Sequence, residues 1–77
     1  MTKQEFRESK EYAEMMEKIK GYHKGFKFTL HYGQIPKAKA NALRTITQDC
    51  IKMGILESKS IGLDIQGNFV EEEYERV

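Results

Sequence analysis

Cysteine is nearly absent from this sequence, and its scarcity excludes two common ways of stabilising a small protein. The only cysteine among the 77 residues is Cys50. No disulfide can therefore form within the chain, and a metal site built from several cysteines is excluded as well. A protein that does not rely on disulfides suits a reducing compartment, so we expect a cytoplasmic location.

Long apolar runs are also missing. No segment approaches the roughly 18 apolar residues of a membrane span, and the charged N-terminal stretch lacks the apolar segment of a signal peptide. Charged residues make up 32% and hydrophobic residues 39% of the chain, which is typical of a folded soluble domain. We expect one small domain, residues 1–77, with no membrane contact and a core of marginal size.

Acidic residues are absent from the middle of the chain. Residues 18–48 carry seven cations and no acid, whereas residues 1–17 sum to −2 and residues 69–77 sum to −3. The formal net charge of +1 conceals this separation. The sequence therefore has a basic middle between two acidic ends, and such an asymmetry is a guide to binding partners.

Hydrophobic spacing predicts two helices and a strand in the first two thirds of the chain. Thr2 and Glu5 fit a helix-capping box, and apolar residues then recur every three or four positions, which predicts a helix over about 3–21. Residues 26–32, "FKFTLHY", alternate strictly and predict a strand with one buried face. Pro36 fits the first position of a second helix over about 36–53, with Gly54 as a left-handed cap.

The C-terminal third predicts a β-hairpin. Ile61, Leu63 and Ile65 alternate with polar residues or glycine, Gly67-Asn68 is a two-residue turn signal, and a glutamate-rich strand returns from Val70. A strand with so many glutamates looks like a charged sheet edge. The order α-β-α-β-β predicts an α+β fold, with two helices on one face of a small, mainly antiparallel three-stranded sheet.

A single core is expected between the helices and the sheet. Its predicted members come from the strand, the second helix and the hairpin: Phe26, Phe28, Leu30, Leu43, Ile46, Cys50, Ile61, Leu63 and Ile65.

The order helix, strand, helix, hairpin resembles that of the winged-helix DNA-binding domains. Those domains contain a further helix, and a turn between "ALRTIT" and "QDCIKMG" would be needed to supply it. No glycine or proline marks such a turn in this sequence. The resemblance is one of element order alone.

The basic segment 18–44 is the main functional signal. Cations interleaved with aromatic residues are the pattern expected of a nucleic-acid contact. Two of them, Lys37 and Lys39, fall in the first turn of a predicted helix, where the helix dipole disfavours cations, and a bound phosphate would explain them. Solvated lysines neutralised by the acidic ends are the alternative. The candidate anion-binding residues are Lys24, Lys27, Lys37, Lys39 and Arg44.

No pattern predicts catalysis, a cofactor or a metal. His23 and His31 have no zinc-ligand spacing relative to Cys50 or Asp64, so we interpret the histidines as exposed and Cys50 as a small core residue. Three consecutive glutamates, 71–73, alternate faces on a strand and do not converge on one site.

The sequence thus predicts a non-enzymatic binding protein whose favoured partner is nucleic acid or another polyanion. A protein-interaction or inhibitor module is the rival hypothesis, and it would act as a homodimer. The Met15-Met16 pair offers an adaptable apolar surface, and self-association is the usual remedy when a small chain cannot cover such a surface.

Overall fold

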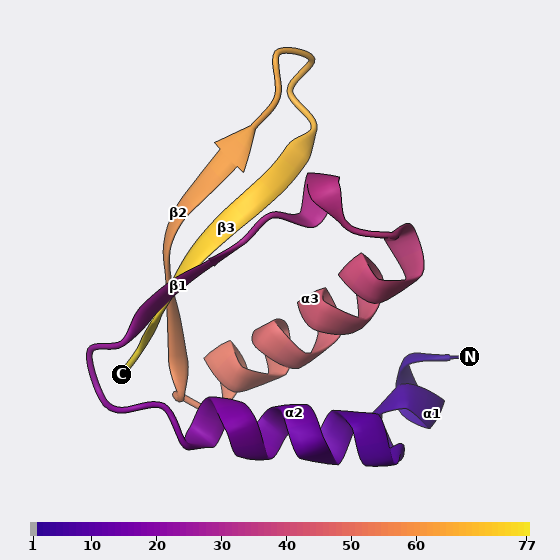
Figure 1. Ribbon diagram of the computed structural model, residues 1–77, viewed down its shortest axis with the longest axis vertical. Helices are drawn as coiled ribbons and strands as arrows, with labels where there is room; N and C mark the ends of the chain where they lie inside the picture. The colour runs from indigo at the N-terminus through magenta and orange to yellow at the C-terminus, as the bar shows by residue number, and fades with distance from the viewer. Residues whose placement is uncertain (1) are drawn as a thin grey trace.

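The computed structural model describes residues 2–77 as two layers, with helices on one face of a three-stranded sheet (Figure 1). The expected α+β class is confirmed. In chain order the elements are α1 (Lys3–Arg7), α2 (Lys10–Lys20), β1 (Lys27–Leu30), the 3₁₀ turn η1 (Tyr32–Gln34), α3 (Lys37–Lys52), β2 (Leu56–Leu63) and β3 (Phe69–Arg76). The helix α3 lies between α2 and the strands.

The first predicted helix is two helices. Thr2 and Glu5 form the expected capping box on α1, but that helix ends after five residues. The Ser9 hydroxyl then accepts a hydrogen bond from the Tyr12 amide and caps a new helix. The prediction of one helix over 3–21 is wrong because a serine in a helical pattern can cap instead of continuing. The break sets the Phe6 and Tyr12 rings edge to face, 5.4 Å apart.

The second predicted helix exists almost as expected. Pro36 is its N-cap rather than its first residue, and the helix runs without interruption from Lys37 to Lys52. Gly54 follows with a φ of +76°, the left-handed conformation that glycine favours at a helix end. Because α3 is unbroken, residues 37–52 do not form a helix-turn-helix pair.

The strands pair antiparallel in the order β1-β3-β2. The glutamate-rich β3 is therefore the central strand, and its interpretation as a charged edge is wrong. β3 is suited to the central position because its side chains alternate between the buried, helix-facing side and the open side of the sheet. Tyr74 and Glu72 face the helices and are buried, whereas Glu71, Glu73 and Glu75 lie on the open face.

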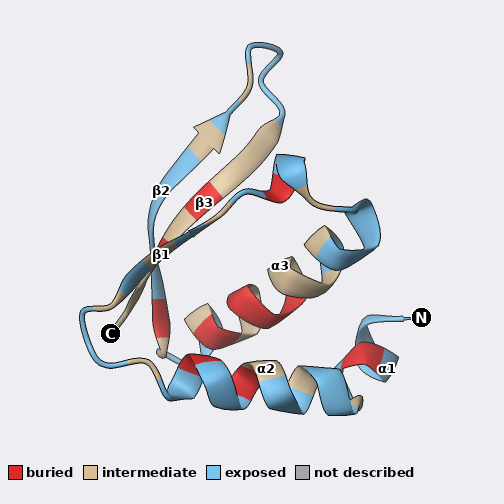
Figure 2. Cartoon of the chain, viewed as in Figure 1, coloured by how far each residue is buried: buried red, intermediate tan, exposed pale blue. Residues whose placement is uncertain are grey.

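The buried core combines three helices with the lower half of the sheet (Figure 2). Ile46 and Cys50 are in it as predicted, and Phe28 and Leu30 pack against it. The core also takes residues that the prediction left out: Phe6, Met16, Ile19, Leu56 and Tyr74.

Five of the predicted core residues lie outside this cluster. Phe26 and Leu43 are half-buried and are neither in the cluster nor packed against it. The other three are exposed. Ile61 is 59% exposed, Leu63 is 62% exposed and Ile65 is fully exposed. The reason is visible in Figure 1, where the β2–β3 hairpin extends beyond the helices that would cover it. The radius of gyration of 12.6 Å is also larger than the roughly 11.5 Å expected for a compact chain of this length.

A polar network lies inside the core. The Glu72 side chain is only 4% exposed and accepts hydrogen bonds from the Ser58 and Tyr74 hydroxyls. The Tyr74 hydroxyl also lies 2.7 Å from that of Tyr32 and 3.2 Å from that of Thr47. Burial is the main reason that the pKa of Tyr74 lies above its ordinary value. Each buried oxygen of this chain of hydroxyls has a partner, which is what allows a carboxylate to sit under the sheet.

Candidate nucleic-acid interface

One side of α3 presents only cations and amides to solvent. Its residues follow one another at intervals of four, three, four and four positions, which places them on one side of an α-helix. We call this set the α3 stripe: Lys37, Asn41, Arg44, Gln48 and Lys52. It carries three positive charges and no acid.

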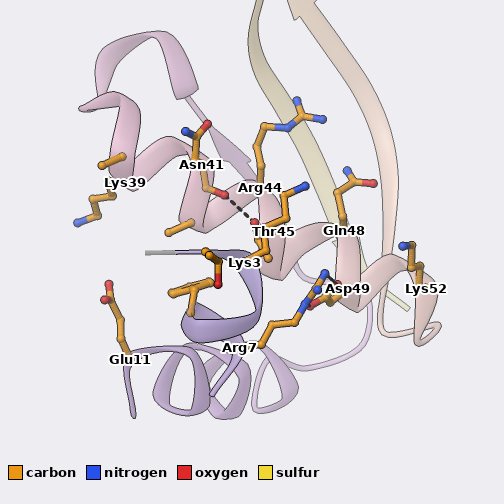
Figure 3. A pocket seen from close by; sticks show the side chains of 14 residues that line it. Lys3, Arg7, Glu11, Lys39, Asn41, Arg44, Thr45, Gln48, Asp49 and Lys52 are labelled. Atoms are coloured by element: carbon orange, nitrogen blue, oxygen red, sulfur yellow. Dashed lines mark hydrogen bonds and ion pairs between the residues drawn. The ribbon is translucent and has the colours of Figure 1, made fainter. Parts of the chain in front are cut away.

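The opposite side of the same helix fixes which way the stripe faces. Ile46 and Cys50 are fully buried, and Thr47 is nearly so. Because these residues anchor α3 to α2 and the sheet, the stripe is turned away from them. Figure 3 shows Asn41, Arg44 and Gln48 pointing to the side of α3 that is remote from α1.

Arg44 is held in place by two aromatic rings. Its guanidinium carbon lies 4.3 Å from the centroid of Phe69 and 5.8 Å from that of Tyr32. Stacking orders the long side chain while leaving the edge of the guanidinium plane available for hydrogen bonds. Within residues 2–77 the Arg44 side chain makes no hydrogen bond or ion pair.

A cleft of about 970 Å³ lies between α3 and α1 (Figure 3). Five of the residues that line it are cationic: Lys3, Arg7, Lys39, Arg44 and Lys52. Only two are acidic, Glu11 and Asp49. Asn41, Arg44, Gln48 and Lys52 belong to the stripe and also line the cleft, so the stripe forms the rim of the cleft on the side remote from α1.

Asp49 is already neutralised inside this surface. Arg7 donates two hydrogen bonds to its carboxylate, at 2.9 and 3.0 Å, and the Tyr12 hydroxyl donates a third at 2.7 Å. The Arg7 guanidinium holds the pKa of Asp49 below its ordinary value. Burial, together with the Asp49 carboxylate, raises the pKa of Tyr12 to about 12. Asp49, the single acid of α3, is thus paired with Arg7 and Tyr12, so its charge does not repel an anion at the stripe.

The structure divides the five predicted anion-binding residues into two groups. Lys39 and Arg44 line the cleft, and Lys37 begins the stripe. Lys24 lies in the loop between α2 and β1, and Lys27 lies on the open face of the sheet opposite Glu75. The basic segment 18–44 is therefore continuous in sequence but not on one surface.

Five basic or amide residues of this surface come from outside the predicted set. Lys3 and Arg7 belong to the N-terminal segment, whose net charge is negative. Asn41 lies inside the basic segment, and Gln48 and Lys52 lie beyond it. The spacing from Lys37 to Lys52 is the signal that would have found the last two. Nothing in the sequence places α1 beside α3.

The open face of the sheet has the opposite character. Glu57, Glu71, Glu73 and Glu75 lie on it, and Lys59 forms ion pairs with Glu57 and Glu75 at 3.5 and 3.7 Å. His31 lies 3.0 Å from Glu71 through its Nδ1 atom. The open sheet face is thus mainly acidic, although Lys27 and Lys59 also lie on it, whereas the α3 stripe carries cations and no acid.

No family model, curated protein or solved structure matches this chain.

The surroundings of Cys50 are those of a core residue. Cys50 is buried beside Met16, with its sulfur 3.7 Å from the methionine sulfur, and burial raises the pKa of the thiol. Within the described residues, no three His, Cys, Asp or Glu side chains are grouped to hold a metal ion. None of the described helices is both long and apolar enough to cross a membrane.

Proposed function

We propose that this protein binds nucleic acid through the α3 stripe and the cations of the adjoining cleft. The observation that carries the proposal is the composition of the solvent-facing side of α3, where three cations and two amides stand with no acid among them. Lysine and arginine supply the attraction to phosphates, and asparagine and glutamine supply hydrogen bonds.

The charge distribution supports the same orientation. The glutamates of the open sheet face would repel a polyanion, whereas the cations of the α3 stripe would attract one. A bound phosphate would also explain why two lysines, Lys37 and Lys39, lie in the first turn of α3. The N-terminus of this helix has no side-chain cap and favours an anion.

A salt titration tests the proposal. A fluorescent 20-base-pair duplex of random sequence is titrated with the protein at several KCl concentrations. If the four lysines Lys3, Lys37, Lys39 and Lys52 each contact a phosphate, the affinity should fall about 10²-fold between 50 and 200 mM salt.

Two double variants with the same change of net charge locate the surface. Lys37→Glu/Lys39→Glu should lower the magnitude of the log–log salt slope by about two. Lys24→Glu/Lys27→Glu should leave the slope unchanged, because those lysines lie away from the cleft. The first variant should melt at or slightly above the parent temperature, since glutamate suits a helix N-terminus. Absence of binding at low salt, or equal losses in both variants, would reject the α3 surface.

A second candidate function is self-association, and the exposed apolar hairpin favours it. Ile61, Leu63 and Ile65 are the most exposed large apolar residues of the β2–β3 hairpin. Exposed apolar patches of this kind mark protein contacts. In this alternative the chain is a protein-interaction or inhibitor module that acts as a homodimer.

A further inference from the structure

We infer that Asn41, Arg44 and Gln48 read base edges in the major groove of duplex DNA, with lysines at both ends of α3 on the flanking phosphates. This inference rests on the proposed function and specifies its ligand. Phosphate contacts alone would explain the lysines at the two ends of the stripe. They do not explain why an amide, a guanidinium and a second amide lie between those lysines.

The chemistry of these three side chains is that of base recognition. Arginine donates two parallel hydrogen bonds to O6 and N7 of guanine, and asparagine and glutamine make paired hydrogen bonds to N6 and N7 of adenine. The lysines, Lys37 and Lys52, are point charges suited to phosphates. The order along α3 therefore places the groups that can discriminate bases between the groups that only attract the backbone.

The dimensions of α3 match the groove. Sixteen residues make a helix about 24 Å long and about 10–12 Å across, which the roughly 12 Å major groove admits. Asn41 and Gln48 are seven residues apart, or about 10 Å along the axis. That length corresponds to about three base steps of 3.4 Å, so the three side chains can meet bases within four consecutive pairs.

Two features prepare the side chains that would contact bases. The guanidinium carbon of Arg44 lies 4.3 Å from the Phe69 centroid, and this contact orders the side chain before any ligand arrives. The side-chain amide of Asn41 makes no hydrogen bond within the described residues, because Thr45 donates to the backbone carbonyl of Asn41 and not to its side chain. Ordering a long side chain in advance lowers the entropy lost on binding.

Duplex DNA fits this surface better than a single strand does. Binding of a single strand relies on exposed aromatic rings on which bases stack. The rings nearest the stripe are Tyr32 and Phe69, but Tyr32 is buried and Arg44 lies over Phe69. The stripe offers hydrogen-bond donors and acceptors instead of a stacking platform.

Selection from a pool of duplexes with a randomised core tests the inference. The enriched sequences should contain a guanine flanked within two positions by adenine. Arg44→Lys keeps the charge but loses the paired hydrogen bonds, so it should relax the preference for that guanine about 5- to 150-fold. Gln48→Ala should relax the preference at an adenine and leave the guanine preferred.

Lys52→Ala is the matched control, because a phosphate contact should weaken all sequences alike. Salt-dependent binding of the pool without an enriched motif would overturn the inference and leave the proposed function standing. A single-stranded pool that competes better than the duplex pool would do the same. Failure of both pools to bind at low salt would overturn both. Thermal melts of every variant confirm that the fold is retained.

Discussion

Asp49 connects all three helices through a single carboxylate. Arg7 comes from α1, Tyr12 comes from α2, and both donate hydrogen bonds to this one residue of α3. Since the two donors are far from Asp49 in the sequence, the cluster forms only when the helices have packed. It also determines that the N-terminal segment lies beside the basic surface.

We predict that Asp49→Asn destabilises the protein by about 1–3 kcal/mol at neutral pH, because hydrogen bonds to a charged group are lost. The folded pKa of Asp49 is depressed, so its contribution is present above the unfolded pKa and is lost as pH falls through the folded value. The difference in unfolding free energy between parent and variant, from urea titrations at pH 7 and near pH 2.5, should therefore shrink in acid. A difference that is equal at both pH values would show that the charge of Asp49 contributes nothing.

The β2–β3 hairpin, at the scale of an element, has two halves with different surroundings. Leu56 at its base is buried in the core, whereas Leu63 near its tip is 62% exposed. The hairpin turn is nevertheless well defined, because the Asp64 side chain accepts hydrogen bonds from the Gln66 and Asn68 amides. The exposed half is thus an ordered projection of the sheet.

A pair of leucine substitutions on β2 tests this division. Leu56→Ala should cost about 2–5 kcal/mol of unfolding free energy, because it leaves a cavity in the core. Leu63→Ala makes the same chemical change on the same strand and should cost less than about 0.5 kcal/mol. Denaturant unfolding at a dilution where the chain is monomeric measures both. Similar losses for the two would mean that the tip of the hairpin is covered in solution.

The molecule as a whole separates charge and apolar surface onto different parts. The α3 side is basic, the open sheet face is acidic, and the free half of the hairpin is apolar. The Met15-Met16 pair is no part of that apolar surface, because Met16 is buried and Met15 packs against the core. If the chain self-associates, the hairpin is the surface available for it.

Self-association through the hairpin predicts a mass near twice 9.0 kDa by sedimentation at micromolar concentration. The double variant Leu63→Ser/Ile65→Ser should then sediment as a monomer without a loss of thermal stability in the monomer, since both residues are exposed. The matched variant Lys24→Ser/Lys27→Ser alters two exposed residues elsewhere and should leave the mass unchanged. A parent protein that stays monomeric at every concentration would remove the homodimer hypothesis.

Local patterns determined the element types. The alternation of "FKFTLHY", the capping box at Thr2 and Pro36 before a helical pattern each depend on neighbours within a few residues, and each is found in the structure. A hairpin turn with Gly67 in it is also present, but it is formed by residues 65–67 between Asp64 and Asn68 and not by the predicted Gly67-Asn68 pair. These signals act through backbone preference and helix or strand period, which a single chain displays directly. The α+β class follows from their order.

Only the tertiary structure decided how far each layer extends and which cations share a surface. The alternation of apolar residues in the hairpin predicts that Ile61, Leu63 and Ile65 are buried. All three are exposed, because the helices do not extend far enough to cover them. The glutamates of β3 predict an edge strand, but the strand order places β3 at the centre of the sheet. Lys3 and Arg7 joined the α3 surface because Phe6 packs into the core and brings α1 with it. Burial and charge clustering arise from contacts between distant segments, and periodicity along one segment carries no information about which segment will cover it.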